Sequence, residues 1–199
     1  HVDFHTLTAA RVVGVEPDQV ELGQRAKIKA MNYGLAYGLS AFGLSQQLAI
    51  STGEAKELMD EYFERFGGVR DYLRSLVEDA RRTEYTETLL GRRRYLPDLT
   101  SDNRQRREMA ERMALNAPIQ GSAADIIKKA MVLVDNWLTD SGLDAKVILQ
   151  VHDELVLEVR EDQVAQVSEK IREHMSAAAK LDVPLLVEVG VGNNWDEAH

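Results

Sequence analysis

Residues 146–159 read KVILQVHDELVLEV, and this stretch decides the fold class. Two runs of β-branched residues and leucines, Lys146–Val151 and Glu154–Val159, flank the pair His152-Asp153. Apolar runs separated by two polar residues are typical of a β-hairpin. We therefore expect two antiparallel strands with His152 and Asp153 at their turn.

The sequence after this hairpin continues with a helix and a further apolar run. Residues 161–179 place apolar side chains on one helical face, at Val164, Val167, Ile171 and Met175. Residues 184–191 are rich in leucine and valine and predict a third strand. Residues 140–199 therefore predict a small antiparallel sheet with a helix packed on it.

The chain before the hairpin has a mostly helical pattern. Four segments are candidate helices: 22–37, 54–66, 69–82 and 103–116. Residues 54–66 and 69–82 repeat apolar side chains at helical spacing, whereas 103–116 is rich in charged residues. Gly67-Gly68 is expected to end the second helix, and Ser122 with Asp125 is typical of a capping box that opens a further helix. The fold class is therefore α+β, a mostly helical part followed by a small antiparallel sheet with a packed helix.

The composition excludes several kinds of protein and of site. The 199 residues are 44% hydrophobic and 29% charged, which is typical of a folded globular chain. There is no cysteine, so disulfides, zinc–thiolate sites, iron–sulfur clusters and cysteine nucleophiles are excluded. No run of apolar residues is long enough to predict a membrane span. The chain begins with His1 and has no signal-peptide pattern, so we expect a piece of a longer cytosolic protein.

The net charge of −9 is distributed unevenly. Residues 81–112 hold nine arginines against six acidic residues, whereas residues 140–199 hold five basic against thirteen acidic residues. This asymmetry suits a protein that holds a polyanion with one part and metal ions with another. Two solvated helical faces of opposite sign are the simpler alternative.

The helix expected at 22–37 carries a stripe of cations and aromatic rings. Arg25, Lys29, Tyr33 and Tyr37 recur every four residues and therefore lie along one face. Two cations one turn apart can hold a polyphosphate, and a tyrosine beyond them can stack on a base. Gly34 costs about 1 kcal/mol relative to alanine in a helix, and close approach of a flat ligand is one compensation. An amphipathic helix with inward-facing tyrosines is the alternative.

The turn of the hairpin places three ionisable residues together, His152, Asp153 and Glu154. A carboxylate held by a rigid sheet is a good ligand for Mg²⁺, which prefers oxygen donors. If extended geometry persists through the bend, Asp153 and Glu154 point to opposite faces and do not share one ion. An aspartate that only favours the turn conformation is the alternative reading.

Two further segments could contact nucleic acid. Asn116 and Gln120 lie four residues apart around a proline, preceded by Arg112, and such side chains can read acceptors in a minor groove. Residues 91–97 carry Arg92, Arg93 and Arg94 beside a tyrosine, which suits phosphate contact. Helix capping and a solvated loop are the respective alternatives.

Taken together and in this order, these segments resemble the family A DNA polymerases, the bacterial DNA polymerase I group. The matching motifs are Asp3-Phe4-His5-Thr6, Arg25-x₃-Lys29-x₃-Tyr33-x₃-Tyr37-Gly38, Gly91-Arg-Arg-Arg-Tyr95, Asn116-Ala-Pro-Ile-Gln120-Gly-Ser and Gln150-Val-His152-Asp153-Glu154. The resemblance covers essentially the whole chain and is strongest to actinobacterial members. It implies a fingers subdomain at 1–118, with nucleotide-binding helix 22–37, and the C-terminal part of a palm at 119–199, with metal-binding hairpin 146–159.

The resemblance also implies roles for single residues. His5, Arg25 and Lys29 would contact the triphosphate of the incoming nucleotide, and Tyr33 would pack on its sugar and base. The DNA would be contacted at the following positions: Tyr37 at the template base, Arg92, Arg93 and Arg94 at phosphates, and Arg112, Asn116, Gln120 and His152 along the nascent duplex. Asp153 would be a metal-bridging aspartate with Glu154 in support, and Lys29, Asp153 and Glu154 would form the catalytic set.

The implied activity is DNA-directed DNA synthesis, the template-directed addition of deoxynucleotides to a primer 3′-hydroxyl with two Mg²⁺ ions, in replication and repair. The implied partners are primer–template DNA and deoxynucleoside triphosphates, with no membrane, for a monomeric protein of the bacterial cytoplasm and nucleoid. The family's other catalytic aspartate lies in an upstream strand motif that this sequence lacks, so we expect the chain alone to be inactive. A catalytically dead DNA-binding module and a metal-dependent phosphohydrolase are the alternatives.

Overall fold

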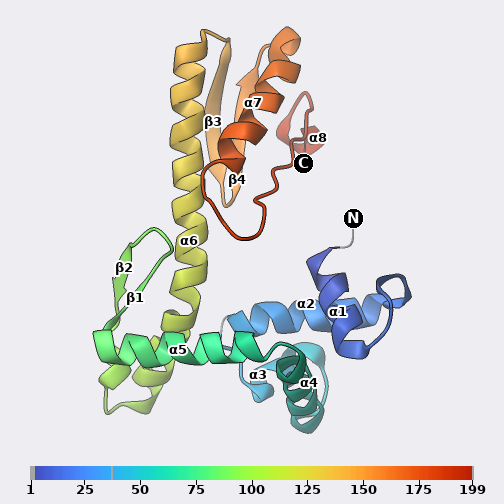
Figure 1. The fold of residues 1–199 in the computed structure, drawn as a ribbon, viewed down its shortest axis with the longest axis vertical. Helices are drawn as coiled ribbons and strands as arrows, with labels where there is room; N and C mark the ends of the chain where they lie inside the picture. The colour runs from blue at the N-terminus through green and yellow to red at the C-terminus, as the bar shows by residue number, and fades with distance from the viewer. Residues whose placement is uncertain (1–2, 37, 199) are drawn as a thin grey trace. The chain divides into compact units, whose positions relative to one another are not determined.

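The computed structural model describes residues 3–36 and 38–198 (Figure 1). The chain divides into two compact units, residues 1–119 and 120–199. The expected α+β class is confirmed, because helices dominate and the described strands form two small antiparallel hairpins. Among the described helices, none is both long and apolar enough to cross a bilayer.

The first unit is built from helices and one short hairpin. Its elements are α1 (Phe4–Val13), η1 (Pro17–Gln19), α2 (Leu22–Ala36), α3 (Ala41–Leu48), α4 (Thr52–Arg65), α5 (Gly67–Thr83), β1 (Tyr85–Glu87), β2 (Arg93–Tyr95), η2 (Pro97–Thr100) and the first part of α6 (Arg104–Ser141). Helix α1 packs against α2 (Figure 1). The core of this region contains Ile28, Met31, Leu44 and Tyr62. These contacts fix one face of α2 in the core, while Lys29 and Tyr33 of the same helix remain exposed.

The helices expected at 22–37, 54–66 and 69–82 are confirmed with small shifts at their ends. The helix expected at 103–116 begins at Arg104 but continues far beyond Asn116. Gly67-Gly68 does not stand as a gap between two helices, because these residues form the first turn of α5. The break lies instead at Phe66, whose backbone is not helical, with φ −122° and ψ 52°. Glycine is tolerated in a first turn, where the backbone N–H groups have no intrahelical partner in any case.

The expectation of a new helix opening at Ser122 is wrong. Residues 104–141 form the single helix α6, with Pro118 inside it and Ser122 buried in its middle. A proline in a helix interior removes one hydrogen bond at a cost of about 3 kcal/mol. Packing offsets this cost, because Ala110 and Ala114 belong to one buried cluster and Val134 and Leu138 to another.

The second unit contains the hairpin expected at residues 146–159. Strands β3 (Ala145–Val151) and β4 (Glu154–Val159) pair antiparallel, with Val151 opposite Glu154. The hairpin is followed by η3 (Glu161–Gln163), α7 (Val164–Ser176) and α8 (Trp195–Ala198). One face of the hairpin packs against α6 and α7 around Val134, Val167 and Ile171. The expected hairpin and helix are therefore confirmed.

The third strand expected at residues 184–191 is wrong. This segment forms no regular secondary structure and pairs with no described strand, and Leu186 and Val191 are 69% and 61% exposed. An apolar pattern favours a strand only where an edge is available to form ladder hydrogen bonds and cross-strand contacts. The described residues of the second unit offer this segment no such pairing.

Candidate functional site

Six side chains from the start of α1 and from α2 lie together, and we name them the α1–α2 cluster: Asp3, His5, Arg25, Lys29, Asn32 and Tyr33. Four of them belong to the set expected to hold a nucleotide, His5, Arg25, Lys29 and Tyr33. The structure therefore brings these four residues together, although they are up to 28 positions apart in the chain.

Asp3 connects the start of α1 to Arg25 of α2. Its carboxylate caps α1 by accepting from the backbone N–H groups of His5 and Thr6 at 3.0 and 3.3 Å. The same carboxylate accepts from Nη2 and Nε of Arg25 at 3.0 and 3.2 Å. The Arg25 guanidinium, with help from the Thr6 hydroxyl, holds the pKa of the Asp3 carboxyl well below its usual range. Asp3 therefore remains ionised and fixes the direction of the guanidinium.

His5 is held between α1 and α2. Its Nδ1 lies 3.1 Å from Nδ2 of Asn32, and its ring lies 5.5 Å from that of Tyr33, centroid to centroid. Partial burial lowers the pKa of His5, and the charge of Arg25 adds to the effect. The imidazole beside two cations therefore favours its neutral form.

Lys29 and Tyr33 present the exposed part of the stripe predicted for this helix. Lys29 is exposed, and within residues 3–36 and 38–198 it has no ion-pair partner. Tyr33 is 50% exposed, so the alternative in which both tyrosines face inward does not hold for this ring. Tyr37, the last residue of the stripe, lies outside the described residues.

The two glycines near the end of α2 have internal explanations. A Cβ on Gly34 would lie 2.7 Å from Cδ2 and 3.2 Å from Cβ of Leu39, so the chain itself fills the space that was attributed to a flat ligand. Gly38 has φ +70°, and a Cβ there would lie 2.8 Å from Leu115 of α6. Gly34 therefore leaves room for the Leu39 side chain, and Gly38 permits a left-handed backbone conformation beside Leu115.

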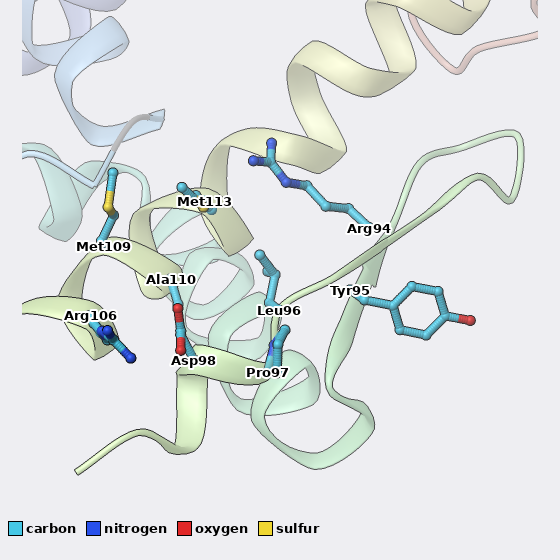
Figure 2. Close-up of a pocket in the computed structure, with 9 residues that line it drawn as sticks. All are labelled: Arg94, Tyr95, Leu96, Pro97, Asp98, Arg106, Met109, Ala110 and Met113. Atoms are coloured by element: carbon cyan, nitrogen blue, oxygen red, sulfur yellow. The ribbon is translucent and has the colours of Figure 1, made fainter. Parts of the chain in front are cut away.

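The three arginines Arg92, Arg93 and Arg94 at the β1–β2 hairpin differ in their surroundings. Arg93 pairs with Glu87, with Nε to Oε2 at 2.9 Å, and its guanidinium lies 4.5 Å from the centre of the Tyr85 ring. Arg94 lines a small open cavity of about 180 Å³ with Arg106 and Met109 (Figure 2). Figure 2 shows the Tyr95 ring turned away from the other lining residues. The cavity is smaller than the sites that hold nucleotide-sized ligands, so this segment offers a charged surface rather than a pocket.

Of the four residues expected along a duplex, Arg112, Asn116 and Gln120 lie on the long helix α6, whereas His152 lies in the β3–β4 turn. Arg112 is exposed and Asn116 is half-buried, one turn apart at the end of the first unit. Gln120 follows one further turn along the helix, as the first residue of the second unit, and is exposed. Because Pro118 does not interrupt the helix, the spacing of these three side chains is that of successive helical turns.

The hairpin turn presents Asp153 to solvent. His152 has a positive φ of 49°, and its carbonyl oxygen accepts from Nε2 of Gln150 at 2.6 Å. Extended geometry therefore does not persist through the bend, and the premise that placed Asp153 and Glu154 on opposite faces is wrong. Asp153 belongs to the turn and is exposed, whereas Glu154 is the half-buried first residue of β4.

No group of three or more potential ligands assembles among the described residues, counting histidine and carboxylate side chains. Asp153 suits Mg²⁺ as a single exposed carboxylate, and its hairpin gives it a fixed position. Among the described residues, Asp153 thus offers one candidate ligand position for a magnesium ion.

Two members of the α1–α2 cluster escaped sequence reasoning. Asp3 was noted only within a motif, although an aspartate before a helix is a standard capping signal that could have found it. Asn32 carries no such signal, because one asparagine inside a helix has no periodic partner. Only the packing of α1 on α2 brings Asn32 to His5.

Comparison with known proteins connects these features. The family model for DNA polymerase family A matches residues 1–197. DNA polymerase I of Mycobacterium tuberculosis is 60% identical over 196 residues, covering 98% of this chain and 22% of that protein. DNA polymerase I of Pseudomonas aeruginosa is 58% identical over 198 residues, covering 100% of this chain and 22% of that protein. The chain thus spans about a fifth of the length of these relatives.

A solved structure matches the fold closely. It is the POL domain of Pol1 from M. smegmatis in complex with DNA primer-template and dNTP, with a TM-score of 0.96 and 60% identity over 98% of this chain and 35% of that chain. The expected likeness to actinobacterial members agrees with the Mycobacterium relatives, although the Pseudomonas relative is nearly as similar. The chain belongs to DNA polymerase family A.

Proposed function

We propose that this chain is the fingers and the C-terminal part of the palm of a DNA-directed DNA polymerase. Acting within a longer protein, it adds deoxynucleotides to a primer 3′-hydroxyl in DNA replication and repair. The observation that carries this proposal is the likeness to a polymerase domain whose structure holds DNA primer-template and dNTP. Residues 1–118 would be the fingers and 119–199 the palm part, and the division of the chain after Ile119 supports this boundary.

The α1–α2 cluster is the proposed nucleotide site. Arg25, held by Asp3, and the exposed Lys29 would bind the triphosphate, and Lys29 would stabilise the charge that develops on the leaving pyrophosphate. Charge-assisted hydrogen bonds from both cations give affinity and direction. Tyr33 would pack on the sugar and base, and His5 would donate to a phosphate oxygen.

The proposed DNA contacts extend over both units. Phosphates would be held by Arg92, Arg93 and Arg94, the template base by Tyr37, and the nascent duplex by Arg112, Asn116, Gln120 and His152. Exposure of Arg112, Gln120 and His152 supports this assignment. The contacts from cations would make affinity fall steeply with salt.

The proposed cofactor is Mg²⁺, two ions in the complete enzyme, with Asp153 as a ligand and Glu154 in support. When bound, divalent ions lower the barrier of phosphoryl transfer by stabilising the attacking and leaving oxygens. The remaining carboxylate ligand would come from the upstream strand motif of the family. The working state is proposed to be a monomer in the bacterial cytoplasm, at the nucleoid.

The test is primer extension by two purified proteins, the 199-residue chain and a longer chain that adds the upstream polymerase sequence. We expect no extension by the first and template-directed extension by the second with Mg²⁺. A longer chain that binds primer–template but never extends it would support the alternative of a DNA-binding module. Release of phosphate without extension would support a phosphohydrolase.

A further inference from the structure

The contact between Asn32 and His5 determines more than the position of a ring. Nδ1 of His5 faces Nδ2 of Asn32 at 3.1 Å, so this ring nitrogen accepts a hydrogen bond from the amide. A neutral imidazole has one acceptor nitrogen and one N–H. With Nδ1 as the acceptor, the proton must lie on Nε2, and Nε2 has no hydrogen-bond partner in the described part of the chain.

The burial of Asn32 favours this amide orientation over its reverse. Oδ1 of Asn32 is buried and has no hydrogen-bond partner among residues 3–36 and 38–198. Reversing the amide would bury the NH₂ group there instead, with its N–H groups unpaired. Buried unpaired N–H groups are rarer than under-satisfied carbonyl oxygens, so the orientation in which the amide donates to His5 is preferred.

The charges around His5 act in the same direction. The groups that bear on the ring are Arg25 and Lys29 of α2, which disfavour an imidazolium, and Asp3 at the start of α1, which favours one. The Tyr33 ring lies beside the His5 ring, tilted by 51° to it, and carries no charge. No charged group of η1 or α4, the other elements packed on α1, is among those that act on the ring in the described chain.

We infer that Asn32 is a positioning residue that holds His5 as a neutral imidazole with its proton on Nε2, so that His5 offers an uncharged N–H donor to a phosphate oxygen of the nucleotide. This inference rests on the proposed function of the α1–α2 cluster. A neutral donor adds a hydrogen bond to the triphosphate site without placing a third cation beside Arg25 and Lys29. Asn32 itself acts only through His5.

The first test uses ¹⁵N-histidine spectra of the 199-residue chain, with the His5 signal among the five histidines identified by its loss in His5→Gln. We expect a protonated Nε2 and an unprotonated Nδ1 in the native chain. Asn32→Ala should raise the pKa of His5, because the donor to its neutral form is lost. Asn32→Asp, of the same shape, should raise it further and move the proton to Nδ1, because a carboxylate accepts from that nitrogen.

The matched control is Gln24→Ala, on the same helix, whose side chain caps the backbone of Glu21 and does not contact His5. It should leave the His5 spectrum unchanged. A proton on Nδ1 in the native chain overturns the inference. An unchanged His5 pKa and tautomer in both Asn32 variants overturns it as well.

The second test measures single-nucleotide incorporation in the longer polymerase. Asn32→Ala should raise KM for the nucleotide about tenfold with little change in kcat, and Asn32→Ala should add nothing in a His5→Gln background. An effect of Asn32→Ala that persists without His5 overturns the inference. If the spectra are as expected but a nucleotide never shifts the His5 signal, the proposed nucleotide site fails while the tautomer assignment stands.

Discussion

The α1–α2 cluster and the β3–β4 turn present their functional groups in opposite ways. In the cluster, Asp3, Arg25, His5 and Asn32 hold one another by direct hydrogen bonds across two helices. At the turn, Asp153 stands exposed, and the described chain gives it no hydrogen bond or ion pair. Under the proposed function, the difference teaches that this chain would preorganise a site for an anion but supply only part of a site for a cation.

The largest effect on the incorporation rate is expected at Asp153, the single metal ligand proposed for this chain. In the longer polymerase, Asp153→Asn should reduce the incorporation rate on the order of a thousandfold or more, since the variant loses the charge of the proposed metal ligand. Its affinity for primer–template should remain nearly unchanged, because no phosphate contact is lost. Single-turnover incorporation and DNA titration measure the two quantities.

The matched control at the turn is Glu154→Gln. Glu154 begins β4 rather than standing in the turn, so its loss should be clearly milder. Equal loss in the two variants would show that both carboxylates act as ligands and that the turn supplies more of the metal site than we propose.

The next effect sharpens the comparison at the nucleotide side. Tyr33 is 50% exposed, and in the proposed site its phenol would replace the hydrogen bond missing in a dideoxynucleotide, so the longer polymerase should use both substrates almost equally. Tyr33→Phe should increase the preference for normal nucleotides about tenfold to a hundredfold. The measurement is the ratio of kcat/KM values. Tyr72→Phe, an equally exposed tyrosine on α5, should leave the ratio unchanged, and an unchanged ratio in Tyr33→Phe would remove Tyr33 from the sugar site.

A third prediction concerns the internal packing that supports the cluster. Gly34→Ala should destabilise the chain by about 1–3 kcal/mol, because the added methyl group meets Leu39. Gly23→Ala, in the same helix with nothing within 4 Å, should be neutral or stabilising by up to about 1 kcal/mol. Thermal unfolding of both variants decides the matter. A stabilised Gly34→Ala variant would contradict this packing explanation and would favour close approach of a ligand as the reason for the glycine.

The smallest effects on function are expected at the β1–β2 hairpin. Neutralising Arg92, Arg93 and Arg94 together should weaken DNA binding and reduce its salt dependence, by about one unit of slope per lost phosphate contact. Arg94→Gln should account for more of the change than Arg93→Gln, because Arg93 is already paired with Glu87. Arg82→Gln, at an exposed arginine of α5, is the control for the two single variants, because it removes the same amount of charge. An unchanged slope in the triple variant would leave this segment as a solvated loop.

Sequence reasoning predicted the elements well where one local signal was sufficient. Alternating apolar runs around His152-Asp153 predicted β3 and β4, and apolar spacing predicted α4, α5 and α7 within a few residues. It failed at Ser122 and at residues 184–191, where the outcome depended on packing that no local pattern reports. The stripe on α2 was predicted because helical spacing by itself puts Arg25, Lys29 and Tyr33 on one face.

The sequence by itself determined the α+β class, the two-residue turn that carries Asp153 and the order of charges along α2, because each depends on residues close together in the chain. Only the tertiary structure decided that Asp3 binds Arg25, that Asn32 lies within hydrogen-bond distance of His5 and that Leu39 fills the space beside Gly34. The first two contacts join α1 to α2, and the third requires the sharp turn after α2. Such contacts form only when burial of the core between helices fixes their mutual positions, which no local propensity specifies.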